Sequence, residues 1–216
     1  MMTSLEHSPC EAFVAQFQKL KLTFPTLEEE KLKFYPIVDN LVSLQRMLEK
    51  GACTIQLRLK NKSMNEIFND AKEAQVMCDK FGCQFFLNDY WQIAVELNLY
   101  GVHLGFEDLQ EAPLKLLEKR GLRLGLSTHS YFELATALVL NPSYIALGPI
   151  YPTTLKKMRF SPQGLERISE WRNLIPSSIP LVAIGGISVE TAKSVFEAGA
   201  NSIAAVSAAE SLLGLL

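Results

Sequence analysis

The chain has 216 residues, of which 48% are hydrophobic and 20% are charged. That length suits one domain with a substantial core, since barrels of alternating strands and helices commonly span roughly 200–250 residues. The formal net charge of -2 provides no overall attraction to nucleic acid or to an anionic membrane, so any basic site must be local.

The N-terminal sequence and the cysteines predict a soluble cytoplasmic protein. "MMTSLEHSPCEAF" has no apolar core of signal-peptide type, and no stretch approaches the ~20 apolar residues of a membrane span. The four cysteines form no CxxC pair and have no zinc-type spacing to the three histidines. Cys53 lies in an apolar run and is predicted to be a small buried side chain. Free thiols are typical of a reducing compartment, and we expect no nucleic-acid or membrane partner.

Residues 1–30 are predicted to be a helical extension of the domain that follows. The segment "AFVAQFQKL" has apolar residues at a helical period. Thr26, with Glu29 three residues later, fits a capping box at the start of a second short element. We therefore expect a helical extension over 1–30 and a barrel domain over 31–216.

From residue 34 onward, short apolar runs alternate with amphipathic, charged segments. Each run is rich in Ile, Val, Leu or Phe and is too short for a buried helix. Several of the segments between them end in Gly, as helices commonly do. The predicted strands cover 34–39, 53–58, 83–89, 101–105, 123–128, 144–149, 181–186 and 202–207. Eight strands alternating with helices favour a closed (β/α)8 barrel, and the absence of GxGxxG after the first strand argues against a doubly wound sheet.

Polar residues and glycines follow most of the predicted strands, at the end where such barrels carry their active sites. Taken singly, several have simpler explanations. Arg58 can be a solvated strand end, and Asn88–Asp89 and Asp108 can cap the helices that follow them. Gly185–Gly186 can serve a tight turn. Those explanations do not account for the gathering of so many polar types at the same ends.

The residue types at these ends suit phosphate and magnesium. Asp89 and Asp108 are hard oxygen ligands without His or Cys beside them, which favours Mg²⁺ over zinc. Arg58, Lys60 and Lys156 provide positive charge for phosphate oxygens. One anion pocket is therefore expected around the metal and these cations.

A second anion pocket is expected around Thr153, Gly186 and Ser207. Gly186 allows close approach of the backbone to a ligand, and "SIAAVSAAES" opens a short helix whose N–H groups can hold a phosphate. His103 and His129 are expected to be structural, because the sequence offers no evident nucleophile or acid–base pair.

Seven segments, in order, closely resemble the thiamine phosphate synthases, which couple the thiazole and pyrimidine parts of vitamin B1. They are "QLRLK", "FFLNDYWQIA", "YGVHLGFEDL", "LGLSTH", "ALGPIYPTTLKKM", "SPQGL" and "AIGGIS". The resemblance implies a Mg²⁺-dependent transferase with small-molecule substrates. It would join 4-amino-5-hydroxymethyl-2-methylpyrimidine diphosphate to 4-methyl-5-(2-hydroxyethyl)thiazole phosphate. In the implied dissociative mechanism, pyrophosphate leaves first and the thiazole nitrogen captures the resulting cation.

The resemblance also assigns site residues motif by motif. For the pyrimidine diphosphate it implies Gln56, Leu57, Arg58, Leu59, Lys60, Asn88, Ser127 and Lys156. The catalytic members of that set would be Arg58, Lys60, Ser127 and Lys156. For the thiazole phosphate it implies Thr153, Thr154, Leu155, Gly186, Val206 and Ser207. Asp89 and Asp108 would hold Mg²⁺.

Two positions depart from the family's pattern. Leu155 stands where the family usually has a second Thr, and losing one charge-assisted hydrogen bond costs ~1.5–3 kcal/mol, or about one to two decades of affinity. Phe106 replaces a polar residue, and it either packs near the mouth or signals an altered substrate. An alternative is therefore a non-catalytic barrel that binds thiazole phosphate or thiamine phosphate as a regulator, or a thiazole isomerase. The apolar face of "AFVAQF" allows a homodimer.

Overall fold

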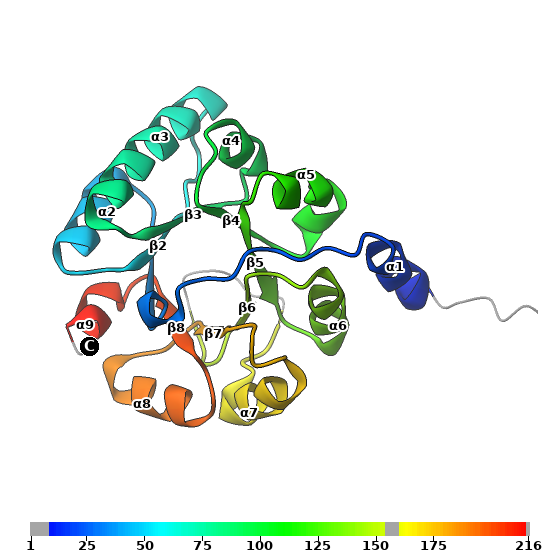
Figure 1. Ribbon diagram of the computed structural model, residues 1–216. Helices are drawn as coiled ribbons and strands as arrows, with labels where there is room; N and C mark the ends of the chain where they lie inside the picture. The colour runs from blue at the N-terminus through cyan, green and yellow to red at the C-terminus, as the bar shows by residue number, and fades with distance from the viewer. Residues whose placement is uncertain (1–8, 154–159, 215–216) are drawn as a thin grey trace, which may run out of the picture.

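The computed structural model describes residues 9–153 and 160–214, and in this part of the chain eight parallel strands close into a barrel (Figure 1). The strands follow chain order, and β1 pairs with both β2 and β8. They are β1 Phe34–Val38, β2 Thr54–Leu57, β3 Gln84–Asn88, β4 Gly101–Leu104, β5 Arg123–Thr128, β6 Tyr144–Leu147, β7 Leu181–Ile184 and β8 Ser202–Ala205. The predicted (β/α)8 barrel is confirmed.

Helices surround the barrel on its outside (Figure 1). They are α1 Pro9–Gln18, α2 Leu41–Glu49, α3 Met64–Phe81, α4 Trp91–Glu96, α5 Leu114–Lys119, α6 Tyr131–Leu140, α7 Gly164–Leu174, α8 Val189–Glu197 and α9 Ala209–Leu213, with short 3₁₀ helices η1 Glu29–Lys31 and η2 Glu107–Gln110. The longest, α3, begins with a capping box at Ser63 and ends at Gly82 in the left-handed conformation. Across the described residues, a helix with the length and apolarity of a membrane span does not occur.

Two apolar clusters stabilise the barrel. One lies between the strands and the surrounding helices, and the other fills the interior enclosed by the strands. In β1, Phe34 and Val38 belong to the outer cluster, whereas Tyr35 and Ile37 belong to the inner one, as the two-residue period of a strand requires. The inner cluster contains Leu27, Leu32, Tyr35, Ile37, Phe86, Tyr144, Ala146, Val182 and Ala204. Its aromatic rings pack edge to face, which is a favoured arrangement of aromatic pairs.

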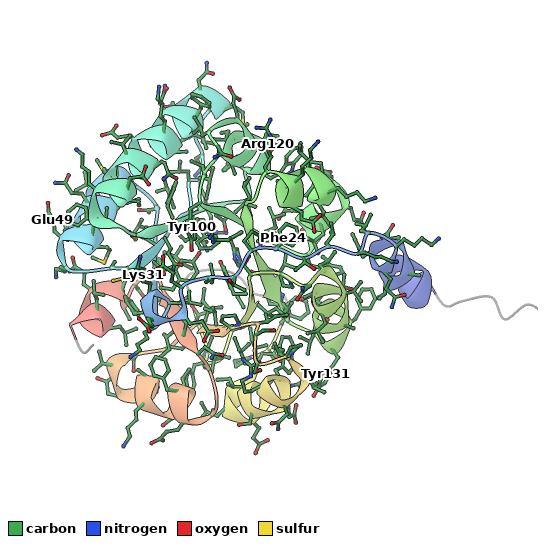
Figure 2. The ribbon with its side chains drawn as sticks, in the orientation of Figure 1. Phe24, Lys31, Glu49, Tyr100, Arg120 and Tyr131 are labelled. Atoms are coloured by element: carbon green, nitrogen blue, oxygen red, sulfur yellow. The ribbon has the colours of Figure 1, made fainter. Side chains whose placement is uncertain are left out.

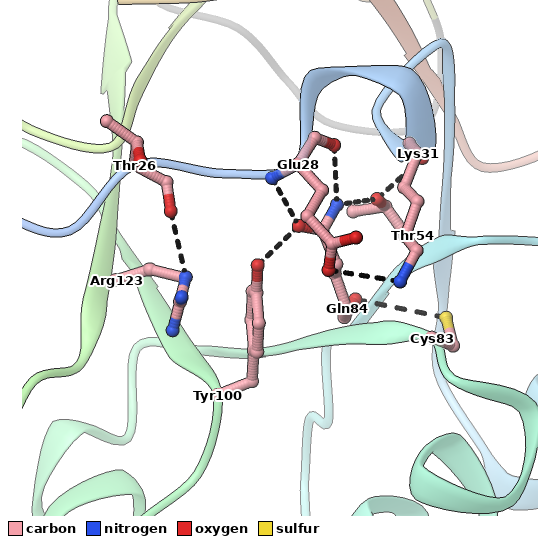
Figure 3. Close-up of polar contacts among 8 residues, drawn as sticks. All are labelled: Thr26, Glu28, Lys31, Thr54, Cys83, Gln84, Tyr100 and Arg123. Carbon is pink, nitrogen blue, oxygen red and sulfur yellow. Dashed lines mark hydrogen bonds and ion pairs between the residues drawn. The ribbon is translucent and has the colours of Figure 1, made fainter.

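The amino end of the barrel is covered by the segment that joins α1 to β1 (Figure 1). Figure 3 shows the contacts, in which Gln84 of β3 is central. The Gln84 Oε1 atom accepts from the backbone N–H of Glu28 at 3.0 Å, and its Nε2 donates to Thr54 Oγ1 at 2.8 Å. The Tyr100 hydroxyl also donates to Gln84. Because this end is closed by the protein's own chain, the carboxyl ends of the strands are left for a ligand.

The extension itself packs against the domain. Helix α1 contacts α6 at the outside of the barrel, and the backbone N–H of Phe24 donates to the carbonyl of Asn141 at 3.2 Å. In Figure 2, Phe24, Lys31 and Tyr100 lie near the centre of the barrel in this view, whereas Glu49 and Arg120 lie on the periphery. The division of the chain at residue 30 stays a prediction.

Two sequence-based predictions about local structure are wrong. Thr26 does not cap a helix with Glu29, because η1 begins after Glu28 and has no side-chain cap. The Thr26 carbonyl instead accepts from Arg123 Nε at 3.1 Å. Cys53 is exposed rather than buried, because it directly precedes β2 and lies outside the strand.

Candidate active site

The predicted site residues that the structure describes gather at the carboxyl end of the barrel. They lie in the carboxyl-terminal half of β2, β3 and β5 or follow β2, β3, β4, β6, β7 and β8, and parallel strands bring all of these ends to one rim. Thr154, Leu155 and Lys156 lie outside the described residues.

Asp89 and Asp108 follow neighbouring strands. Asn88 of β3 is in register with His103 of β4, and the Asp89 backbone N–H donates to the His103 carbonyl at 2.9 Å. Asp108 lies in η2, directly after β4, and its Oδ2 accepts from the Gly105 N–H at 2.9 Å. The two carboxylates are therefore held at adjacent positions of the rim.

The simpler explanation of these residues as helix caps is wrong. Helix α4 has Tyr90 at its N-cap and α5 has Pro113, and neither N-cap makes a side-chain hydrogen bond. Asp89 also adopts a φ of 67°, a left-handed conformation in which Asn and Asp are enriched among non-glycine residues.

The donor set at this part of the rim suits magnesium. Within the described ranges, no three His, Cys, Asp or Glu side chains come together as a metal cluster. Two carboxylates without nitrogen or sulfur donors do not make a zinc site. They do fit Mg²⁺, which is commonly held by one or two carboxylates and completes its shell with water and substrate phosphates.

In segment 56–60 the two cationic residues are more exposed to solvent than the other three. Gln56, Leu57 and Leu59 are buried, with exposed fractions of 2%, 0% and 3%. Arg58 is half-buried and its backbone N–H donates to the Val38 carbonyl, while Lys60 is exposed. Among the residues that the structure describes, neither cation forms an ion pair.

The Ser127 hydroxyl forms a hydrogen bond with His103, and both ring nitrogens of His103 have hydrogen-bond partners. The Ser127 Oγ lies 2.8 Å from His103 Nε2, and the Tyr144 hydroxyl lies 2.7 Å from His103 Nδ1. Burial, together with the nearby positive charge of Arg58, lowers the pKa of His103 to about 3. The imidazole is therefore neutral at physiological pH and holds Ser127 by a hydrogen bond rather than by charge.

His129 lies at the same end of β5, where it is fixed by its neighbours. Its Nδ1 lies 3.0 Å from Glu133 Oε2, and its ring stacks on Phe160 with centroids 4.6 Å apart. Both histidines thus have structural partners, which agrees with the expectation for them.

The residues predicted for the thiazole phosphate lie across β6, β7 and β8. Gly186 has a φ of 66°, and a Cβ at this position would lie 2.5 Å from the Pro152 carbonyl oxygen. The segment that leads to Thr153 therefore packs directly against the end of β7, an approach that only Gly permits. Val206 and Ser207 follow β8 and are exposed, before α9 begins at Ala209. Asn88, predicted for the other substrate, is 5% exposed at the end of β3.

Phe106 packs against Phe132 of α6, with ring centroids 5.6 Å apart in an edge-to-face arrangement. This contact with Phe132 supports the interpretation that Phe106 has a packing role near the mouth of the barrel.

Sequence reasoning missed Tyr35 and Tyr144, which are 1% and 0% exposed inside the barrel. Their signal was a phenol within a buried apolar strand, because a buried hydroxyl requires a partner. Tyr144 meets this requirement with His103, which connects it to the rim.

Comparisons with known proteins agree on one family. The family model described as thiamine monophosphate synthase matches residues 34–209. A thiamine-phosphate synthase of Yersinia pestis (strain Pestoides F) is 47% identical over 185 residues, covering 86% of this chain and 85% of that protein. One from Citrobacter koseri is 46% identical over 178 residues, covering 82% and 84%. The solved thiamine phosphate pyrophosphorylase from Pyrococcus furiosus superposes with a TM-score of 0.75 at 30% identity, covering 86% of this chain and 92% of that one.

Proposed function

The chain belongs to the thiamine monophosphate synthase family, and we propose from this how its residues perform the thiamine-phosphate synthase reaction. The enzyme is a transferase that acts on small molecules. The proposed substrates are 4-amino-5-hydroxymethyl-2-methylpyrimidine diphosphate and 4-methyl-5-(2-hydroxyethyl)thiazole phosphate, and the products are thiamine phosphate and pyrophosphate. A homodimer and a cytoplasmic location stay predictions from the sequence.

One observation carries the assignment of the diphosphate site. Asp89 and Asp108 follow neighbouring strands, and the half-buried residue Arg58 lies at the same rim without an ion pair among the described residues. A diphosphate would supply an anion for Arg58, whose planar guanidinium can bind two of its oxygens. A divalent cation bound with the diphosphate would be held by Asp89 and Asp108.

The protein's own groups then stabilise the departing diphosphate. The planar guanidinium of Arg58 donates hydrogen bonds to two of its oxygens, a geometry that suits phosphate. Lys60 and Lys156 add positive charge, and Ser127 donates a hydrogen bond. Mg²⁺ held by Asp89 and Asp108 would neutralise negative charge on the diphosphate oxygens. Such electrostatic stabilisation of developing charge is commonly the largest contribution to catalysis.

The second substrate is assigned to the opposite part of the rim. Thr153, Thr154, Leu155, Gly186, Val206 and Ser207 are proposed to hold the thiazole phosphate. The thiazole nitrogen would attack the pyrimidine methylene carbon once its bond to the diphosphate oxygen has broken. No residue must accept a proton in this step, which agrees with a neutral His103 whose ring nitrogens both face hydroxyl groups.

Pyrophosphate release with both substrates and Mg²⁺ tests this function. We expect release that depends on both substrates, and Arg58→Ala should reduce it far more than Arg120→Ala, which removes an exposed cation after α5. No release at millimolar substrate, together with measurable binding of the thiazole phosphate, would establish the alternative of a non-catalytic barrel. The departures at Leu155 and Phe106 are the residues that motivate that alternative.

A further inference from the structure

We propose that a buried chain of hydrogen bonds sets the tautomer of His103, so that Ser127 directs its hydroxyl proton toward the diphosphate. Tyr144 is then a positioning residue that acts on the substrate through His103 and Ser127. This inference rests on the proposed function, because it assigns a task to the diphosphate site.

The hydrogen-bond chain runs from the middle of the barrel to its carboxyl rim. Gln56 Nε2 donates to the Tyr35 hydroxyl at 3.1 Å, and the Tyr35 and Tyr144 hydroxyls lie 2.9 Å apart. Tyr144 then meets His103 Nδ1 at 2.7 Å, and His103 Nε2 meets Ser127 Oγ at 2.8 Å. The first four members are at most 7% exposed, so water does not interrupt the chain.

The strand register brings these side chains together. Gly125 of β5 is in register with His103 of β4 on one side and with Tyr144 of β6 on the other. A Cβ on Gly125 would lie 2.1 Å from Tyr144 Cζ and 2.3 Å from its hydroxyl oxygen. The missing side chain of Gly125 therefore lets the Tyr144 hydroxyl cross β5 and reach the imidazole. Ser127 follows two residues later on β5, so it projects to the same interior face.

The Gln56 amide gives the chain a direction. A side-chain N–H can only donate, so the Tyr35 oxygen accepts from Gln56 and its single proton is left for Tyr144. Tyr144 accepts that proton and gives its own to His103 Nδ1. In the reverse direction the Tyr35 proton would face neither partner, which leaves a buried donor unsatisfied at a cost.

This direction decides what Ser127 offers to a ligand. With Nδ1 accepting from Tyr144, the ring proton of His103 lies on Nε2 and is donated to Ser127 Oγ. The half-buried Ser127 hydroxyl then has its own proton available for the rim. A hydroxyl donor suits a phosphate oxygen, whereas the reversed chain would turn oxygen lone pairs toward the negative ligand.

The tautomer is measured directly on the full-length protein. Nitrogen-15 NMR of the histidine rings, assigned with His103→Gln, should show His103 protonated at Nε2 and bare at Nδ1. A proton on Nδ1, or on both nitrogens, would overturn the proposal. This measurement needs neither substrate nor turnover, so its failure is distinct from failure of the pyrophosphate-release assay.

A double-mutant cycle tests the route through Ser127. We expect Tyr144→Phe to weaken binding of inorganic pyrophosphate with Mg²⁺ about three- to tenfold, and Ser127→Ala about tenfold or more. Combining the two should add nothing to Ser127→Ala alone, because Tyr144 acts through Ser127. Tyr100→Phe, which removes a phenol hydroxyl at the amino end of the barrel, should leave pyrophosphate affinity unchanged. A Tyr144→Phe effect that persists undiminished in the Ser127→Ala background would show a merely structural role.

Discussion

Replacing Asp89 by Asn isolates its charge from its backbone conformation. Asp89 has a φ of 67°, and four other described non-glycine residues have positive φ values, from 48° to 57°. Three of them are Asn61, Asn98 and Asn141, and the fourth is Lys21. Asn tolerates this region because its short amide bonds locally. Asp89→Asn therefore keeps the residue type that this backbone favours, whereas Asp89→Ala adds a strain of about 1–2 kcal/mol.

The expected magnitudes for the two substitutions differ accordingly. We expect Asp89→Asn to change the free energy of unfolding by less than ~0.5 kcal/mol, as for an exposed position. Removing one of the two carboxylates should weaken Mg²⁺ affinity about ten- to a hundredfold, which corresponds to ~1.5–3 kcal/mol for a charge-assisted contact. Turnover should fall most at limiting Mg²⁺ and recover in part when Mg²⁺ is raised.

The assay is initial-rate pyrophosphate release over a Mg²⁺ titration, with urea unfolding as the stability measurement. Asp79→Asn provides a matched control, because Asp79 accepts from Gln75 on the exposed side of α3, and it should behave as the wild type. If Asp89→Asn keeps the Mg²⁺ midpoint and the rate of the wild type, Asp89 does not hold the metal.

Three further predictions concern the barrel interior. Leu32→Ala, at a side chain 1% exposed in the inner cluster, should cost ~2–5 kcal/mol in urea unfolding, while Met64→Ala, 51% exposed, should be nearly neutral; equal effects would contradict the closure at the amino end. Gly125→Ala should cost ~1–3 kcal/mol through overpacking against Tyr144 and should weaken pyrophosphate binding, and wild-type values for both would refute the cross-strand contact. The pKa of His103 is lowered to about 3, so the unfolded chain binds the extra proton first. The contribution of His103 to the free energy of unfolding is therefore fully present above pH ~6.5. It decreases as the pH falls toward ~3, by at most ~1.4 kcal/mol per pH unit. His103→Gln should flatten that decline, and identical pH profiles would contradict a buried neutral imidazole.

The sequence predicted the architecture well because its signals are local. Apolar runs such as 181–186 and 202–207 are too short for buried helices, and Gly82 marks the end of a helix as its position suggested. Eight buried strands alternating with helices can be packed in few ways. The number of strands therefore favoured the closed barrel that the structure has. The polar positions at strand ends then identified one rim without any knowledge of strand pairing.

Of the two predictions that failed, one depends on a contact between distant segments and the other on the residue at which a strand begins. Thr26 follows the capping pattern, yet its carbonyl accepts from Arg123, 97 residues further along the chain. Cys53 stands beside β2, but the strand begins one residue later and leaves the thiol outside. No local pattern reports which side chain arrives from another strand.

Gln56 and Gln84 show why position along the barrel axis matters more than residue type. Both lie on buried strands, and Thr54 of β2 is in register with Gln84 of β3. Gln56 is therefore one inward-facing layer nearer the carboxyl rim than Gln84. The lower glutamine binds the segment that covers the amino end, and the upper one donates to Tyr35 at the start of the chain that reaches Ser127. The family resemblance assigned Gln56 to the pyrimidine diphosphate, and that assignment stays a prediction. Arg58 directly follows β2, whereas Gln56 lies within it. In the proposed hydrogen-bond chain, Gln56 would act on the diphosphate through Tyr35, Tyr144, His103 and Ser127.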